Sequence, residues 1–224
     1  MVVDHVNRMW LGDKIFAMTL VGRTTFPLFC YAVAVAVKKM EGNAARLNQY
    51  IFRLLLLALA AEPVSVLTRN EGMVNVVFTL ACGALFAGLA RRMKDGHVML
   101  CYLLAVISMF LPQTMEFGLL GAALPSAILL VMENRLRFLP WLIALLTIVN
   151  LGGSTELFDH VAPAAVAEVL LVSLLSVTLL PGLTLRIGQD LPQDGRFLPK
   201  YFFHAFYPGH LFVLWIAKLI FFGS

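Results

Sequence analysis

The chain has 224 residues, of which 60% are hydrophobic and 13% are charged. Its mean hydropathy is +0.86. Soluble domains average about 45–50% apolar and about 25% charged residues, so this composition indicates an integral membrane protein. It excludes a polar or disordered tail of the kind that binds nucleic acid. The cysteines Cys30, Cys82 and Cys101 all lie in apolar segments, which predicts neither a disulfide framework nor a metal site.

Long apolar runs predict the secondary structure. In hydrocarbon every backbone amide must bond within the protein, so such runs form helices, and about 20 residues cross the bilayer. The runs cover residues 15–37, 51–67, 73–90, 97–111, 117–132, 138–151, 161–181 and 201–222. The run at 138–151 is short enough to be a half-helix or a re-entrant segment. Residues 1–6 read as the end of a further apolar helix that lacks its front half. We therefore predict a single all-α domain over residues 1–224, a polytopic membrane bundle of about eight transmembrane helices plus a truncated N-terminal helix.

Basic residues alternate between the connections. Cytoplasmic loops of membrane proteins contain more Lys and Arg than extracytoplasmic loops, so the distribution of basic residues predicts the orientation of the chain in the membrane. The basic clusters are Lys38, Lys39, Arg46 and Arg53; Arg91, Arg92 and Lys94; Arg135 and Arg137; and Arg186, Arg196 and Lys200. The intervening connections collect Glu71, Glu116, Glu156 and Asp159 instead. We expect the basic connections in the cytoplasm, with the N-terminal stub and the C-terminus on the extracytoplasmic side.

Polar side chains inside spans are candidate functional residues, because each costs about 2.5–3.5 kcal/mol on insertion scales. Four groups qualify: Asp4 and His5 with Asn7; Arg23; Glu62 and Pro63 with Asn70 and Asn75; and His204, Tyr207, Pro208 and His210. Structural alternatives stand beside these readings. Arg23 suits pairing with a buried acid, Pro208 suits a helix kink, and Glu168 suits helix packing.

The predicted topology places His5, Arg23 and His210 between the middle and the outer half of the membrane, where they can converge. Two imidazoles, a carboxylate and a guanidinium suit removal of a proton from a nucleophile and stabilisation of a tetrahedral intermediate. This combination points to acyl transfer.

Four motifs occur along the chain: MVVDHVN at 1–7, VGRTTFPLF at 21–29, EGMVNVVF at 71–78 and FYPGHL at 206–211. In this order they resemble the TraX family of conjugative pilin acetylases. The resemblance implies a multi-pass protein of the bacterial inner membrane that transfers an acetyl group from acetyl-CoA to the N-terminal amine of a pilin subunit. It also implies a likeness to membrane acyltransferases that modify sugars. Family members usually carry most of a helix before the Asp-His motif, whereas only residues 1–3 precede it here.

The chemistry of acetyl transfer assigns roles to these residues. His5 is expected to be the general base, and Asp4 either favours its productive protonation state or pairs with Arg23. His210 is the second candidate base, or it contacts the thioester carbonyl together with Tyr207 and Asn75; a covalent acetyl-histidine relay is a further route. Arg23 and Arg53 are expected to meet the donor's phosphates or the oxyanion, and Asn7 to contact substrate.

Two other functional classes remain open for this sequence. A membrane transporter or pilus-assembly factor would use a polar cavity without chemistry, with Glu62 and Glu168 as candidate coupling acids. An acetyltransferase acting on a sugar is the other. No repeated half is evident in the sequence, which favours the enzyme. The expected partners are membrane lipid and pilin, without nucleic acid or metal, and the oligomeric state is left open.

Overall fold

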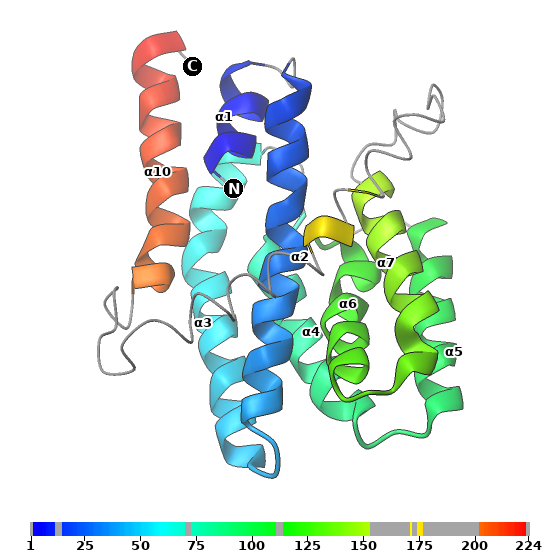
Figure 1. Cartoon of the computed structure of the whole chain (residues 1–224). Helices are drawn as coiled ribbons and strands as arrows, with labels where there is room; N and C mark the ends of the chain where they lie inside the picture. The colour runs from blue at the N-terminus through cyan, green and yellow to red at the C-terminus, as the bar shows by residue number, and fades with distance from the viewer. Residues whose placement is uncertain are drawn as a thin grey trace, which may run out of the picture.

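The computed structural model describes residues 2–11, 15–69, 73–110, 114–152, 171, 174–176 and 202–222. The all-α prediction is confirmed, since the only β pairing within these residues is an isolated bridge between Val74 and Met115. In chain order the elements are α1 (Val2–Trp10), α2 (Phe16–Lys39), α3 (Ala44–Arg69), α4 (Val76–Ala90), α5 (Asp95–Ile107), η1 (Ser108–Phe110), α6 (Gly118–Met132), η2 (Leu136–Phe138), α7 (Leu139–Gly152) and α10 (Phe202–Phe222) (Figure 1). The predicted run at 161–181 lies largely outside the described residues.

Two helices begin at residues that differ from the starts of the apolar runs, because capping asparagines determine where these helices begin. α3 begins before its apolar run, where the Asn43 side chain accepts a hydrogen bond from the Arg46 amide at 2.9 Å. α4 begins three residues into its run, because Asn75 caps it by accepting from the Val77 amide at 3.0 Å. An N-cap side chain satisfies amides that the first helical turn leaves unpaired.

Length and composition permit one described helix to cross a membrane, the segment Ala44–Leu67 of α3. The other apolar helices found by the same test are 10–17 residues long: Val76–Ala90, Asp95–Phe110, Gly118–Met132, Leu136–Asn150 and Phe206–Ile220. The number of crossings therefore stays a prediction. Large apolar side chains are exposed along α3, α5 and α10, as on surfaces that contact lipid or a partner.

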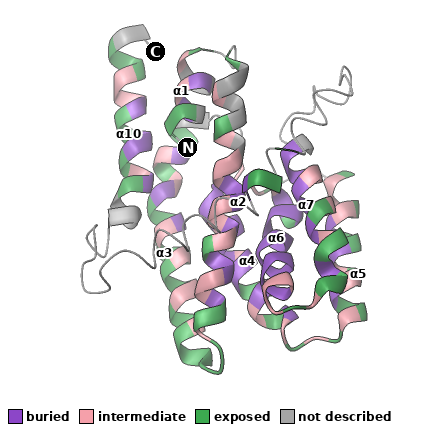
Figure 2. Cartoon of the chain, in the orientation of Figure 1, coloured by how far each residue is buried: buried purple, intermediate pink, exposed green. Residues whose placement is uncertain are grey.

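α6 forms the centre of the fold. It packs against α2, α4, α5 and α7, and every residue from 120 to 130 is buried (Figure 2). The contact with α4 is close at Gly83, where a Cβ atom would lie 2.8 Å from Cγ of Pro125. On the other side of the molecule, α10 packs against α3 and α1, and α1 packs against α2.

Ion pairs show that three basic connections lie at one end of the bundle. Arg91, after α4, pairs with Glu41 of the α2–α3 turn and with Glu133, after α6. Arg135 and Arg137 both pair with Asp95 at the start of α5. We call this end the basic end. The described connections thus group as the charge pattern predicts, while the compartment each end faces stays a prediction.

Candidate functional site

The structure brings His5 and His210 together from opposite ends of the chain. His5 lies on α1 and His210 on α10, and their ring centroids are 5.5 Å apart with a tilt of 38°. Both side chains are buried, at 7% and 9% exposed. The packing of α10 against α1 produces this contact, so the two imidazoles, which we call the histidine pair, occupy one helix interface.

A backbone contact fixes the tautomer of His210. Its Nδ1 lies 2.8 Å from the carbonyl oxygen of Phe206. A carbonyl only accepts hydrogen bonds, so Nδ1 carries the proton and the neutral ring keeps its lone pair on Nε2. Nε2 is buried and has no hydrogen-bond partner in the part of the chain that the structure describes. The site therefore holds an imidazole with an available basic nitrogen.

Two aromatic rings from the same helix surround His210. Phe206 stacks on the imidazole, with centroids 5.0 Å apart and 16° between the planes. The buried Tyr207 approaches at 5.8 Å and 63°. Phe206 is 40% exposed, so it forms the outer cover of the histidine.

Asn7 closes the connection between α1 and α2. Its Nδ2 donates to the carbonyl of Ile15 at 3.1 Å, and its Oδ1 accepts from the Ile15 amide at 3.2 Å. The side chain is fully buried. These two bonds anchor α1 against the start of α2, and α1 in turn carries His5 to α10.

Asn75 is bonded on every side. Nδ2 donates to Oε2 of Glu62 at 2.6 Å and to the carbonyl of Ala58 at 2.8 Å, while Oδ1 caps α4. The Asn75 backbone amide adds a 3.0 Å bond to the same Glu62 oxygen. Glu62 thus lies at the N-terminus of α4, where the helix dipole favours a carboxylate. In this arrangement both amide hydrogens of Asn75 are used within the protein.

The remaining expected residues are less defined. Asp4 lies on α1 and Arg23 on α2, but their side chains, like those of Glu168 and His204, fall outside the described part. Arg53 is on the exposed surface of α3. The structure therefore unites His5, His210 and Tyr207, and it separates Asn75 into its own network.

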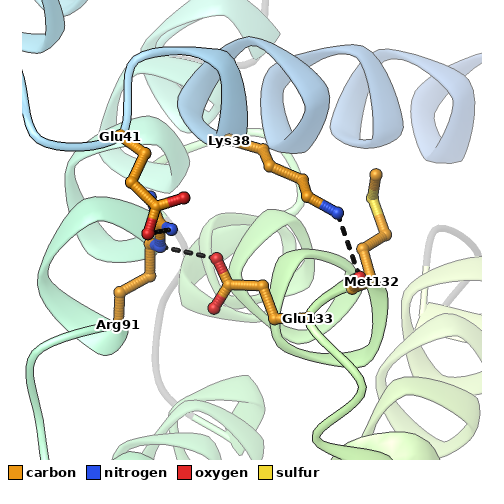
Figure 3. Close-up of polar contacts among 5 residues, drawn as sticks. All are labelled: Lys38, Glu41, Arg91, Met132 and Glu133. Atoms are coloured by element: carbon orange, nitrogen blue, oxygen red, sulfur yellow. Dashed lines mark hydrogen bonds and ion pairs between the residues drawn. The ribbon is translucent and has the colours of Figure 1, made fainter.

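A second polar cluster forms at the basic end, and of its members only Lys38 and Arg91 are singled out by the sequence pattern, as parts of the basic connections. The Arg91 guanidinium contacts Glu41 through Nη2 and Glu133 through Nε, the latter at 2.6 Å (Figure 3). Beside it, Nζ of Lys38 donates to the carbonyl of Met132 at 3.1 Å. A cavity of about 370 Å³ lies next to this cluster. The alternating basic connections were the only signal for it in the sequence.

The fold and the site define a helical, membrane-associated protein with a buried histidine pair at a helix interface. The chain belongs to the TraX family, since the family model described as TraX protein matches residues 1–218. Membership indicates a conjugation-related, pilin-modifying protein. No curated protein and no solved structure matches the chain.

Proposed function

We propose that this protein is a multi-pass N-acetyltransferase of the bacterial inner membrane, which transfers acetyl from acetyl-CoA to the N-terminal amine of a pilin subunit. The observation that carries the proposal is the histidine pair, in which the Phe206 carbonyl engages Nδ1 of His210 and leaves Nε2 without a hydrogen-bond partner among the described residues, beside His5. TraX membership supplies the link to pilin.

The proposed chemistry needs a base. An α-amino group has a pKa of about 7.7–8.0, so a fraction of it has already given its ammonium proton to solvent at neutral pH, and this neutral amine must lose one further proton to the base as it becomes the amide. Nε2 of His210 takes that proton while the amine nitrogen bonds to the thioester carbon. The C–S bond then breaks, and the CoA thiolate receives the proton from the imidazolium, so the enzyme returns to its starting state. The sequence favours His5 as the base; we assign the role to His210 because its Nε2 has no hydrogen-bond partner among the described residues, and His5 becomes the second candidate at the same site.

A relay is the alternative route when donor and acceptor lie on opposite sides of the membrane. Nε2 then attacks the thioester itself, CoA leaves as the thiolate, and the pilin amine displaces the imidazole from the acetyl group. Both routes require the same histidine. In both, Tyr207 is proposed to contact the acetyl carbonyl, with Arg23 and Arg53 proposed to meet the donor's phosphates. Asp4 is proposed to set the protonation of His5.

Intact-mass measurement of co-expressed pilin tests the proposal. The native chain should add the mass of one acetyl group at the N-terminal amine. His210→Gln should lower the rate by about 100-fold or more, the range typical of losing a general base. His5→Gln should also impair the reaction. The matched control is His97→Gln, an exposed histidine on α5 that should keep full activity.

The proposal is wrong if the His5→Gln and His210→Gln variants both insert into the membrane at native levels and both still acetylate pilin fully.

A second measurement separates an acetyltransferase from a transporter. Acetyl-CoA at about 100 times its Kd should stabilise the detergent-solubilised protein by about 2.7 kcal/mol, because a ligand of the folded state shifts unfolding. A transporter of another solute should show no such shift.

A further inference from the structure

The cavity at the basic end has the size and position of a ligand site. Its volume is about 370 Å³, within the range of about 300–1,000 Å³ typical of small-molecule pockets. It opens between the α2–α3 turn, the end of α4 and the end of α6, and its charged lining residues are Glu41, Arg91, Arg92 and Glu133. Three separate connections thus meet around one hollow.

Cations dominate the surroundings of the cavity. Arg92 lines it, is exposed and makes no ion pair with any described residue. The exposed side chains of Lys39, Arg46 and Lys94, on the same connections, likewise have no ion-pair partner within the described chain. Among these five basic residues, Arg91 differs in that it forms ion pairs with Glu41 and Glu133, and its side chain is 15% exposed. The lining itself holds two arginines and the two carboxylates Glu41 and Glu133, so the excess positive charge near the cavity comes from Lys39, Arg46 and Lys94 on the same connections.

The two carboxylates on Arg91 differ in how firmly they are held. Glu133 is 20% exposed and packs at the end of α6. Glu41 is 69% exposed and projects from a turn whose Gly42 has φ +74° and open space around its Cα. Glu41 can therefore rotate into solvent and leave Nη2 of Arg91 facing the cavity, while Glu133 keeps the guanidinium in place.

We propose that this cavity binds a phosphate-bearing anion of nucleotide size, whose phosphate replaces the Glu41 carboxylate on Arg91 and is also contacted by Arg92. Guanidinium binds phosphate and carboxylate with the same bidentate geometry, so one can substitute for the other. A nucleotide in this cavity is separate from the acetyl donor of the proposed function, because the 24 residues of α2, about 36 Å, lie between the cavity and the histidine pair and exceed the reach of one CoA molecule. The headgroup of an anionic lipid shares the same chemistry.

The cavity and the histidine pair are separate sites. His5 is carried by α1, which precedes the start of α2, whereas Arg91 pairs with the turn that follows its end. The 24 residues of α2 span about 36 Å at 1.5 Å per residue. Substituting the histidines should therefore leave anion binding unchanged, which makes failure of this proposal distinguishable from failure of the proposed function.

Binding of adenosine 3′,5′-bisphosphate to the full chain in nanodiscs of zwitterionic lipid tests the site. Arg92→Gln should weaken binding by about ten-fold, the effect of losing one charge-assisted hydrogen bond. Glu41→Gln should tighten it several-fold, because the competing carboxylate is gone. His210→Gln should bind as the native chain does. The matched control is Asp95→Asn, which removes an ion-paired carboxylate at the same end but outside the cavity lining.

A second arm replaces the nucleotide with vesicles that contain anionic lipid. If the Arg92 and Glu41 variants change vesicle binding but no nucleotide binds, the phosphate site stands and its ligand is a lipid headgroup. If neither variant changes the binding of any probe, the site is wrong, whatever the outcome for pilin acetylation. Arg91→Gln is less informative because it leaves Glu133 without its ion-pair partner, so the diagnostic variant is Arg92→Gln at unchanged Tm.

Discussion

One carboxylate oxygen of Glu62 accepts hydrogen bonds from both the backbone amide and the side chain of Asn75. The same asparagine caps α4 and bonds the carbonyl of Ala58, so a single residue joins α3 to the start of α4. This network fixes the relative position of the two helices. It also explains a polar residue at a position where the apolar run alone predicted an uninterrupted helix.

Asn75→Ala should lower the free energy of unfolding by about 2–4 kcal/mol, through the lost cap and the buried acceptors left on Glu62 and Ala58. The matched control is Asn43→Ala, which removes an exposed cap of α3 and should cost about 1 kcal/mol. Thermal unfolding in detergent measures both. A double-mutant cycle with Glu62→Gln isolates the carboxylate–amide coupling, and additivity of the two changes would contradict the network.

The turn before α6 packs against Gly121. Phe117 has φ +62°, and its ring stacks on Phe26 with centroids 3.9 Å apart. A Cβ atom at Gly121 would lie 2.6 Å from Cβ of Phe117 and 2.9 Å from Cζ of Phe26. Gly121→Ala should therefore destabilise the protein by about 1–3 kcal/mol, as overpacking does.

The control for this prediction is Gly96→Ala on α5, where a Cβ atom meets nothing within 4 Å. An alanine there should be neutral or stabilise by up to about 1 kcal/mol, since glycine is the weaker helix former. Equal Tm values for the two variants would show that the contact at Gly121 is not tight.

The sequence predicted the helices well where the apolar run and the helix coincide. The expected runs at 15–37 and 117–132 match α2 (Phe16–Lys39) and α6 (Gly118–Met132) to within two residues. The run at 51–67 lies well inside α3 (Ala44–Arg69), because hydropathy detects the apolar part of a helix and not its polar first turns. The cap at Asn75 and the bridge between Val74 and Met115 depend on tertiary contacts, which no local pattern contains.

The candidate site was predictable in part. Topology alone placed His5 and His210 in the same half of the membrane, and the structure puts their rings 5.5 Å apart. The stacking of Phe206 on His210 follows from their spacing on one helix but had no distinct signal. The cluster of Glu41, Arg91 and Glu133 could not be found, since its ion pairs join three connections whose proximity is set by packing.

Phe206 covers His210, and its removal should expose the imidazole. Phe206→Ala should raise the rate at which diethylpyrocarbonate modifies His210 severalfold, measured by peptide mass spectrometry with the exposed His97 as internal reference. Phe206→Tyr should keep the native rate, because it preserves the ring.

Phe212 provides the matched control for this prediction. It is an exposed aromatic residue on the same helix that stacks on Trp215, with centroids 6.0 Å apart, rather than on a histidine. Phe212→Ala should leave the modification of His210 unchanged. The same rate in Phe206→Ala as in the native chain would show that the ring does not restrict access.

Acid pH should affect anion binding through Glu41. The Arg91 guanidinium donates a hydrogen bond to this carboxyl and adds a favourable charge, and together they hold its pKa below the ordinary value of 4.5. The carboxylate is therefore formed at neutral pH, and it is lost as the pH falls through the lowered pKa. Above that range Glu41 competes with a bound phosphate for Arg91, and below it the competition ends.

The measured quantity is the ratio of the Kd of the native chain to that of Glu41→Gln for adenosine 3′,5′-bisphosphate, so that protonation of the phosphates affects both terms alike. The ratio should exceed one at neutral pH and fall toward one as the pH falls through the lowered pKa of Glu41. Asp95→Asn should give a ratio near one throughout, because Asp95 does not line the cavity. A ratio for Glu41→Gln that persists unchanged below the lowered pKa would mean that its effect does not arise from the carboxylate charge, and the exchange of Glu41 for phosphate on Arg91 would be wrong.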